Sequence, residues 1–206
     1  MASSVKVSQI ASILPSGVGY GNLFLRAKQV ATTLECFIAS ADIELCVDHV
    51  PRERSMVRHT LKVPFNNQEK ANILREASAV WERMSDPTDK DVCIPHDGYL
   101  KVFQLQRPLL EQYDCIMMDE SQDSTPAMAD VVLRQTCAKI FVGDPHQKIY
   151  GFRGAINSLN TITDAATFYL TQSFRFGPEI SYVASCLLEK MKGETRKTLV
   201  GGAQAG

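Results

Sequence analysis

The sequence predicts an α/β protein in which an all-helical first half precedes the beginning of a parallel sheet. Apolar residues recur at helical spacing through residues 1–108, with no strand-rich core of their own. From residue 113 onward, apolar runs of about four residues alternate with helical segments. Buried strands that alternate with helices are typical of a parallel sheet covered on both faces.

Composition sets mild bounds on fold and function. The 206 residues are enough for one domain or slightly more. A net charge of −1 gives no overall basic excess for nucleic acid, although a neutral protein can carry a basic groove. No apolar run approaches the ~18 residues of a membrane span, and the N-terminus lacks a secretory signal pattern.

The six cysteines form no Cys-x-x-Cys pair, which indicates reduced thiols. The four histidines lie at no zinc-ligand spacing from them, so the sequence does not favour a zinc site. Cys115 lies inside an apolar run, where we expect a buried thiol.

The first half is expected to begin with a short helix over residues 5–14. The glycines of residues 17–21 predict a connector, because they follow no strand and lack the Lys and Ser/Thr of a phosphate loop. Asn22 is expected to cap a helix whose apolar face extends to Ile38, and residues 41–50 form a second, shorter helix.

Residues 51–63 are rich in charge, which fits a solvated loop or a loop that contacts phosphate. Asn66 or Asn67 is expected to start a long amphipathic helix. Trp81 lies on its apolar stripe, where a core anchor is favoured over a base-stacking platform. A turn-rich linker follows, and Asp97 caps a last helix.

Three strands and three helices are expected in the second half. The apolar runs that predict strands are residues 115–118, 139–142 and 167–170. The intervening helices are expected over residues 127–133, 155–162 and 178–191. Functional groups of such sheets gather beyond the carboxyl ends of the strands, and a polar cluster follows each of these three runs.

The first cluster is Asp119 and Glu120, directly after the first run. A carboxylate at a strand end suits Mg²⁺, which prefers oxygen ligands, and a second one can take a proton from an attacking water. The alternative is that the two acids cap the helix that starts near Ser124.

The second cluster begins with Gln147, whose amide can contact a terminal phosphate or the attacking water. Tyr150 and Phe152 bracket a glycine and precede Arg153. Aromatic faces stack on bases and an arginine meets the phosphate backbone, so these three are candidate DNA contacts. Alternatively, the two rings are core residues and the arginine forms a surface ion pair.

The third cluster is Phe174 and Arg175, ahead of a Gly-Pro helix start. Phe174 can stack on a purine, and Arg175 can serve as an arginine finger that stabilises charge on a transferring phosphoryl group.

The order and spacing of the clusters carry more weight than any one of them. Residues 119–123 (Asp-Glu-Ser-Gln-Asp), 142–155 and 170–175 resemble motifs II, III and IV of UvrD-like superfamily 1 DNA helicases. Flanking residues 96–101 and 197–202 are similar to the F-box DNA helicases of that family. The resemblance implies a P-loop NTPase fold with RecA-like sheets and a 3′ to 5′ motor on single-stranded DNA that uses ATP and Mg²⁺.

The resemblance also implies a role for each residue at the ATP. Asp119 would hold Mg²⁺, and Glu120 would contact the Mg²⁺ through a water and activate the attacking water. Gln147 would sense the γ-phosphate. Phe174 would lie against adenine, and Arg175 would reach the γ-phosphate.

On the DNA side, Tyr150, Phe152 and Arg153 would link that sensing to the strand. Ser121 departs from the alanine usual between the glutamate and the glutamine, and we expect its small hydroxyl to do little harm.

The domain organisation that the resemblance implies has three parts. Residues 1–108 would form a helical accessory subdomain, 109–165 the C-terminal half of the first RecA-like domain, and 166–206 the start of the second. No Gly-x-x-x-x-Gly-Lys-[Ser/Thr] occurs, so the family's phosphate loop and final motifs are expected outside this sequence.

The family further implies a nuclear protein of recombination control and DNA repair. Recombinase filaments and a cullin-based ubiquitin ligase would be partners through regions of the parent that are absent here. Because the phosphate loop is missing, a non-catalytic DNA- or protein-binding module derived from a helicase stays open as an alternative for this chain.

Overall fold

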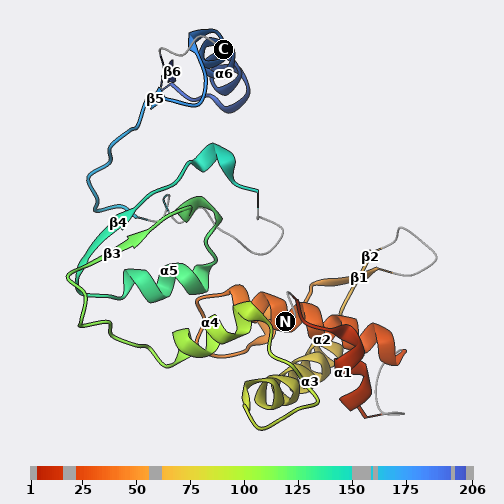
Figure 1. Cartoon of the computed structure of the whole chain (residues 1–206). Coiled ribbons are helices and arrows are strands. Elements are labelled where there is room, and N and C mark those ends of the chain that lie inside the picture. The colour runs from red at the N-terminus through yellow and green to blue at the C-terminus, as the bar shows by residue number, and fades with distance from the viewer. Residues whose placement is uncertain are drawn as a thin grey trace. The chain divides into compact units, whose positions relative to one another are not determined.

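The computed structural model describes residues 4–15, 22–55, 62–149, 159, 162–195 and 198–202 (Figure 1). The chain divides into two compact units, Met1–Thr161 and Ile162–Gly206. No helix in the described part of the chain is long and apolar enough to cross a membrane.

The N-terminal unit begins with a helical subdomain. Its helices are α1 (Val7–Ile13), α2 (Leu23–Ala39), α3 (Asn67–Ser85) and α4 (His96–Leu105). The caps confirm two predictions: the Asn22 side chain accepts a hydrogen bond from Phe24 N, and Asn66 forms a capping box with Glu69.

The core of this subdomain lies where α1, α2 and α3 meet. Ile10, Val30, Leu34 and Val80 are among its buried side chains, and Trp81 packs against them. The Trp81 ring also meets Phe37 edge-on, with ring centroids 5.4 Å apart. These contacts favour a core role for Trp81. Arg26 and Glu76 form a buried ion pair between α2 and α3.

The predicted helix over residues 41–50 is wrong. Only the short 3₁₀ turn η1 (Val47–His49) forms there. Side chains satisfy the local backbone instead, since Ser40 Oγ accepts from Asp42 N and His49 Nδ1 accepts from Cys46 N. Such bonds compete with the helical ladder.

Two further corrections concern the first 108 residues. They are not all-helical, because β1 (Glu53–Ser55) pairs antiparallel with β2 (Lys62–Pro64). Asp97 is not the cap of α4: the cap is Pro95, the helix begins at His96, and Asp97 lies in its first turn.

The second part of this unit is a strand, helix, strand sequence. It comprises β3 (Cys115–Met118), the 3₁₀ turn η2 (Ser121–Asp123), α5 (Pro126–Leu133) and β4 (Ala138–Phe141). The strands are parallel and in register from Cys115–Ala138 to Met118–Phe141. The predicted parallel pairing through a helix is therefore confirmed for these strands.

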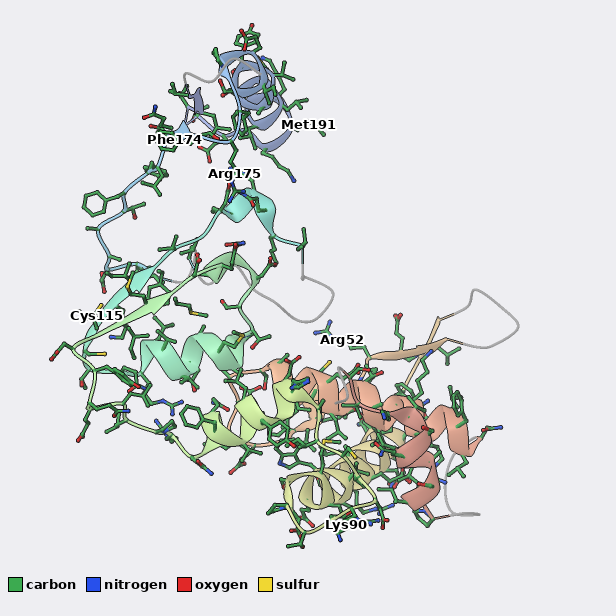
Figure 2. All side chains as sticks on the ribbon, viewed as in Figure 1. Arg52, Lys90, Cys115, Phe174, Arg175 and Met191 are labelled. Atoms are coloured by element: carbon green, nitrogen blue, oxygen red, sulfur yellow. The ribbon has the colours of Figure 1, made fainter. Side chains whose placement is uncertain are left out.

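The prediction that both faces of this sheet are covered is wrong for the described residues. Side chains alternate along both strands, so Met117 is 72% exposed and Ile140 46% exposed on the same side of the pleat. Cys115, labelled in Figure 2, is exposed rather than buried for the same reason. All six cysteines are free thiols.

Buried polar side chains of α4 tie the helical subdomain together and to α5. Lys101 Nζ donates to the backbone oxygens of Ser40, at 2.9 Å, and Asp42, and lies 4.3 Å from the centre of the Phe37 ring. Burial lowers the pKa of Lys101 to about 8, against the opposing charges of Asp42 and Asp130. Gln104 Nε2 donates to Asp130 Oδ2 of α5 at 2.7 Å.

The C-terminal unit is small. It comprises β5 (Gln172–Ser173), α6 (Pro178–Lys192) and β6 (Val200–Gly201), with the two strands parallel. The strand predicted at residues 167–170 is wrong: Phe168 and Leu170 are exposed, and pairing begins only where Thr171 O accepts from Val200 N. The helix predicted over 155–162 lies almost wholly outside the described residues.

Candidate functional site

Two loops meet at the carboxyl ends of β3 and β4. Asp119 and Glu120 directly follow β3, as predicted. The loop after β4 joins them through the backbone, because Ser121 N donates to Val142 O at 2.9 Å and Val142 N donates to Met118 O at 2.8 Å. The parallel sheet thus brings together two polar segments that are separated by a whole helix in sequence.

Gln122 is the side chain that joins these loops. Its side chain is buried, and it bonds to one residue on each loop. Its Nε2 donates to Glu120 Oε2 at 2.6 Å, and its Oε1 accepts from Asp144 N at 3.0 Å. Because an amide has both a donor and an acceptor, one side chain can fix a carboxylate on one loop and a peptide on the other.

Asp144 continues the connection to Gln147. Its Oδ1 accepts from His146 N at 3.0 Å, which caps the 3₁₀ turn η3 (Pro145–Gln147). Its Oδ2 accepts from Gln147 Nε2 at 2.9 Å. A continuous hydrogen-bonded path, called here the Glu120–Gln147 path, therefore runs from Glu120 through Gln122 and Asp144 to Gln147.

Glu120 has a left-handed backbone, with φ 50° and ψ 37°. This conformation costs a residue with a Cβ atom about 1–2 kcal/mol, and such residues cluster at functional sites. Glu120 N donates to Asp119 Oδ1 at 2.8 Å, so the turn also orients the first carboxylate.

Gly143 allows the loops to approach each other. A Cβ atom there would lie 2.4 Å from Gln122 Oε1 and 3.1 Å from Ser121 N. The position therefore needs a residue with no side chain.

Ser121 is accommodated, in line with the expectation of little harm. It is fully buried, and its Oγ donates to Met118 O at 2.8 Å. The hydroxyl is thus satisfied inside the turn. Asp123, at the end of the same turn, accepts from Ile149 N at 3.0 Å and so holds the far end of the second loop.

The residues present fit a Mg²⁺ ion as a partial set of ligands. Asp119 and Glu120 are exposed carboxylates at a strand end, and Mg²⁺ is held by one or two carboxylates together with waters and phosphate oxygens. Within the described ranges, no group of three or more His, Cys, Asp or Glu side chains is arranged to hold a metal ion alone.

The remaining predicted site residues are distributed differently. Tyr150, Phe152 and Arg153 lie outside the described residues. Phe174 and Arg175 belong to the C-terminal unit and directly follow β5 (Figure 2). Phe174 is 80% exposed, and Arg175 N donates to Ser173 Oγ at 3.2 Å.

Sequence reasoning missed the two middle members of the Glu120–Gln147 path. Gln122 and Asp144 were visible as polar residues inside two clusters, but neither was assigned a role. The only available signal was that each stands two to three residues from a predicted site residue after a strand. Their burial and pairing depend on the parallel register, which the sequence does not specify.

Comparison with known proteins agrees with the sequence motifs. Residues 58–166 match the UvrD/REP helicase N-terminal domain. F-box DNA helicase 1 of Gallus gallus is 47% identical over 188 residues, which cover 90% of this chain and 18% of the relative. F-box DNA helicase protein 1 of Schizosaccharomyces pombe is 34% identical over 179 residues, 84% of this chain and 19% of the relative.

A bacterial relative supports the same assignment: DNA helicase II of Escherichia coli is 30% identical over 112 residues, 50% of this chain and 16% of the relative. The chain therefore spans about a fifth or less of the length of these curated relatives. The predicted resemblance is confirmed, and the chain belongs to the UvrD/REP helicase family.

Proposed function

We propose that this chain is part of an ATP-dependent DNA helicase that moves 3′ to 5′ on single-stranded DNA. The observation that carries the proposal is the Glu120–Gln147 path, which joins the carboxylate proposed to activate water to the amide proposed to sense phosphate. An acid that only caps the next helix would not need a buried amide to hold it. Here the cap of α5 is Thr125, so the capping alternative for Glu120 loses its main support.

Each residue has a task that its position supports. Asp119 would hold Mg²⁺, which neutralises phosphate charge when bound. Glu120 would accept a proton from the attacking water, with Gln122 keeping its carboxylate in place. Gln147 would respond to the terminal phosphate, and a shift there would reach Glu120 through Asp144 and Gln122.

The other half of the ATP contacts would come from the C-terminal unit and from regions outside this sequence. Phe174 would stack on adenine and Arg175 would stabilise charge at the γ-phosphate. Phe174 is exposed, so its ring face is accessible for stacking on a ligand.

Tyr150, Phe152 and Arg153 would contact single-stranded DNA and couple it to Gln147. A nuclear role in DNA repair and recombination control is part of the proposal, as the family resemblance implies. Recombinase filaments and a cullin-based ubiquitin ligase would be engaged through regions beyond this sequence.

The test is Glu120→Gln in a polypeptide that joins this sequence to the phosphate loop and remaining motor motifs. The variant should bind ATP normally and lose ~10²–10⁴-fold in DNA-stimulated turnover, because an amide cannot accept the proton. The exposed Glu111→Gln is the matched control and should keep its rate. Near-normal turnover by Glu120→Gln would place the base elsewhere.

A non-catalytic binding module is the second candidate for the chain by itself, favoured by the absence of a phosphate-loop motif from its sequence. That motif supplies the backbone donors and the lysine that cradle the β- and γ-phosphates. The purified chain should therefore hydrolyse ATP no faster than background. DNA-stimulated ATP hydrolysis by the purified chain, in a preparation free of contaminating helicases, would refute this expectation.

A further inference from the structure

A second cluster of reactive side chains lies in the segment between α2 and β1, outside the helicase motifs. Cys46 Sγ lies 3.3 Å from His49 Nδ1. On the other side of the same ring, His49 Nε2 lies 3.0 Å from Asp42 Oδ2 and 3.1 Å from Ser40 Oγ. A thiol, an imidazole and a carboxylate therefore stand in line, which is the arrangement of a nucleophile, its base and a group that orients the base.

The hydrogen bonds settle which nitrogen of His49 carries the proton. A carboxylate only accepts, so Asp42 requires Nε2–H. Nδ1 is then an acceptor, which agrees with the 3.0 Å bond from Cys46 N. The lone pair of Nδ1 accepts this backbone bond, and the Cys46 sulfur lies beside it at 3.3 Å, so Nδ1 can take the thiol proton once the backbone bond is released.

The protonated His49 ring would also have a hydrogen-bond acceptor at Nδ1. Nδ1 lies 3.2 Å from the carbonyl oxygen of Cys46. This oxygen can accept a hydrogen bond from Nδ1 only when Nδ1 carries a proton. The Asp42 carboxylate lies 3.0 Å from Nε2 on the other side of the ring. Protonation of Nδ1 would set its N–H against the Cys46 backbone N–H, so that backbone bond must be released when the ring takes a proton.

The His49 ring is buried, whereas Cys46 as a residue is partly exposed. His49 is 6% exposed and meets the Phe37 ring edge-on, with centroids 5.3 Å apart. Cys46 as a residue is partly exposed, and the proposal requires that a peroxide reach its sulfur. The backbone oxygens of Ser40 and Asp42 are fixed by Lys101 Nζ, which keeps the orienting segment in place.

From this geometry we propose that Cys46 is a modification site, a nucleophilic thiol that reacts with peroxides. The sulfur attacks one oxygen of hydrogen peroxide, the O–O bond breaks, and a sulfenic acid forms. His49 Nδ1 takes the thiol proton and returns it to the departing hydroxide, which leaves as water. Sulfur loses two electrons and the peroxide gains them, so thiol plus hydrogen peroxide gives sulfenic acid plus water.

The other thiols of the chain provide internal references. Cys93 and Cys115 are exposed, and neither has a hydrogen-bonded histidine among the described contacts. Cys36 is also exposed, and its pKa is raised by burial of the thiol group and by the charge of Glu35, which disfavours the reactive thiolate. If accessibility alone governed reactivity, Cys93 and Cys115 would react before Cys46.

The experiment treats the full chain with limiting hydrogen peroxide, traps sulfenic acid with dimedone and maps labelled peptides by mass spectrometry. Cys46 should be labelled about tenfold faster than Cys93 and Cys115, a conservative part of the ~10²–10⁴-fold that a positioned base contributes. Labelling of Cys46 at or below the rate of the exposed thiols would overturn the proposal.

Two variants separate activation from simple access. His49→Gln should slow Cys46 labelling about tenfold while Cys93 is unchanged. Because His49 is buried and this variant can unfold, Asp42→Asn provides the second arm: its side chain is 62% exposed, so the fold should tolerate it. It should slow Cys46 labelling by roughly two- to fivefold, less than His49→Gln because an exposed charge is screened. Unchanged Cys46 labelling in a folded Asp42→Asn chain would contradict the assigned role of Asp42 and with it the proposal.

Discussion

Gln122 Oε1 accepts a hydrogen bond from Asp144 N at 3.0 Å, which links the loop after β3 to the loop after β4. Gln122 is buried, whereas the glutamate that it holds and Gln147 at the end of the path are exposed. The rigid part of the site is therefore the bridge in its middle, and the groups that would meet ligand lie at its ends.

Replacing this bridge tests its structural contribution. Gln122→Leu keeps a similar volume but leaves Asp144 N without its side-chain acceptor, so the free energy of unfolding should fall by ~1–3 kcal/mol. Gln147→Leu, at the exposed end of the path, should cost under ~1 kcal/mol. Urea unfolding of the two variants measures the difference, and equal losses would show that the bridge is not special.

Gly143→Ala tests the close approach of the loops. The added methyl would meet Gln122 Oε1 and the backbone N of Ser121, so the loops must separate at a cost of ~1–3 kcal/mol in unfolding free energy. Ser121 N–H and Gln122 should also lose hydrogen-exchange protection at their amides. A stable Gly143→Ala chain with unchanged exchange would mean that the loops adapt freely.

The buried ion pair between α2 and α3 offers a prediction about the helical subdomain. Glu76→Gln removes the charge beside Arg26, whose side chain is buried but keeps a bond to Pro15 O. We expect a loss of ~2–4 kcal/mol, since removing one partner of a buried pair is strongly destabilising. Glu82→Gln on the exposed side of α3 is the control, and thermal melting should leave it within a degree or two of the parent.

Lys101 predicts how stability changes at alkaline pH. Its pKa is about 8 in the folded chain and 10.5 as the ordinary value, so the unfolded chain binds more protons between these two pH values. The stability of the parent relative to Lys101→Met should therefore rise as the pH increases from about 8 to 10.5.

Urea unfolding at several pH values across that window gives the two curves. The exposed Lys90→Met, at the site labelled in Figure 2, is the control, and its difference from the parent should stay flat. A parent that loses stability relative to Lys101→Met as the pH rises would reverse the sign and show that the buried ammonium is favoured.

The sequence was informative where a local pattern determines the structure. Asn22 and Asn66 predicted the starts of two helices, because capping needs only a side-chain oxygen near the amides of the next turn. Asp119 and Glu120 were placed at a strand end because a four-residue apolar run has few alternatives when acids follow it. The family was evident from the order of three motifs, which no single local pattern would have revealed.

The errors arose where contacts distant in sequence decide the outcome. Residues 41–50 have enough apolar positions for a helix, but Ser40, Asp42 and His49 bond to one another. The backbone oxygens of Ser40 and Asp42 also accept from Lys101, which is distant in sequence. Cys115 appeared buried because its run is apolar, yet only one face of a pleated strand is covered here. Gln122 gave only a weak signal, because its partner Asp144 lies in the loop after β4.

The exposure of apolar side chains in the C-terminal unit has a consequence for its folding. Among its described residues, no apolar side chain is buried, and Phe168, Leu170 and Phe174 are each at least 80% exposed. Ordering a residue costs about 1–2 kcal/mol of backbone entropy, and here only partly buried apolar side chains, such as Phe176 and Leu188, offset that cost. This unit should therefore complete its folding only against a surface that covers these side chains. The free energy of binding that surface would then include the free energy of ordering the unit.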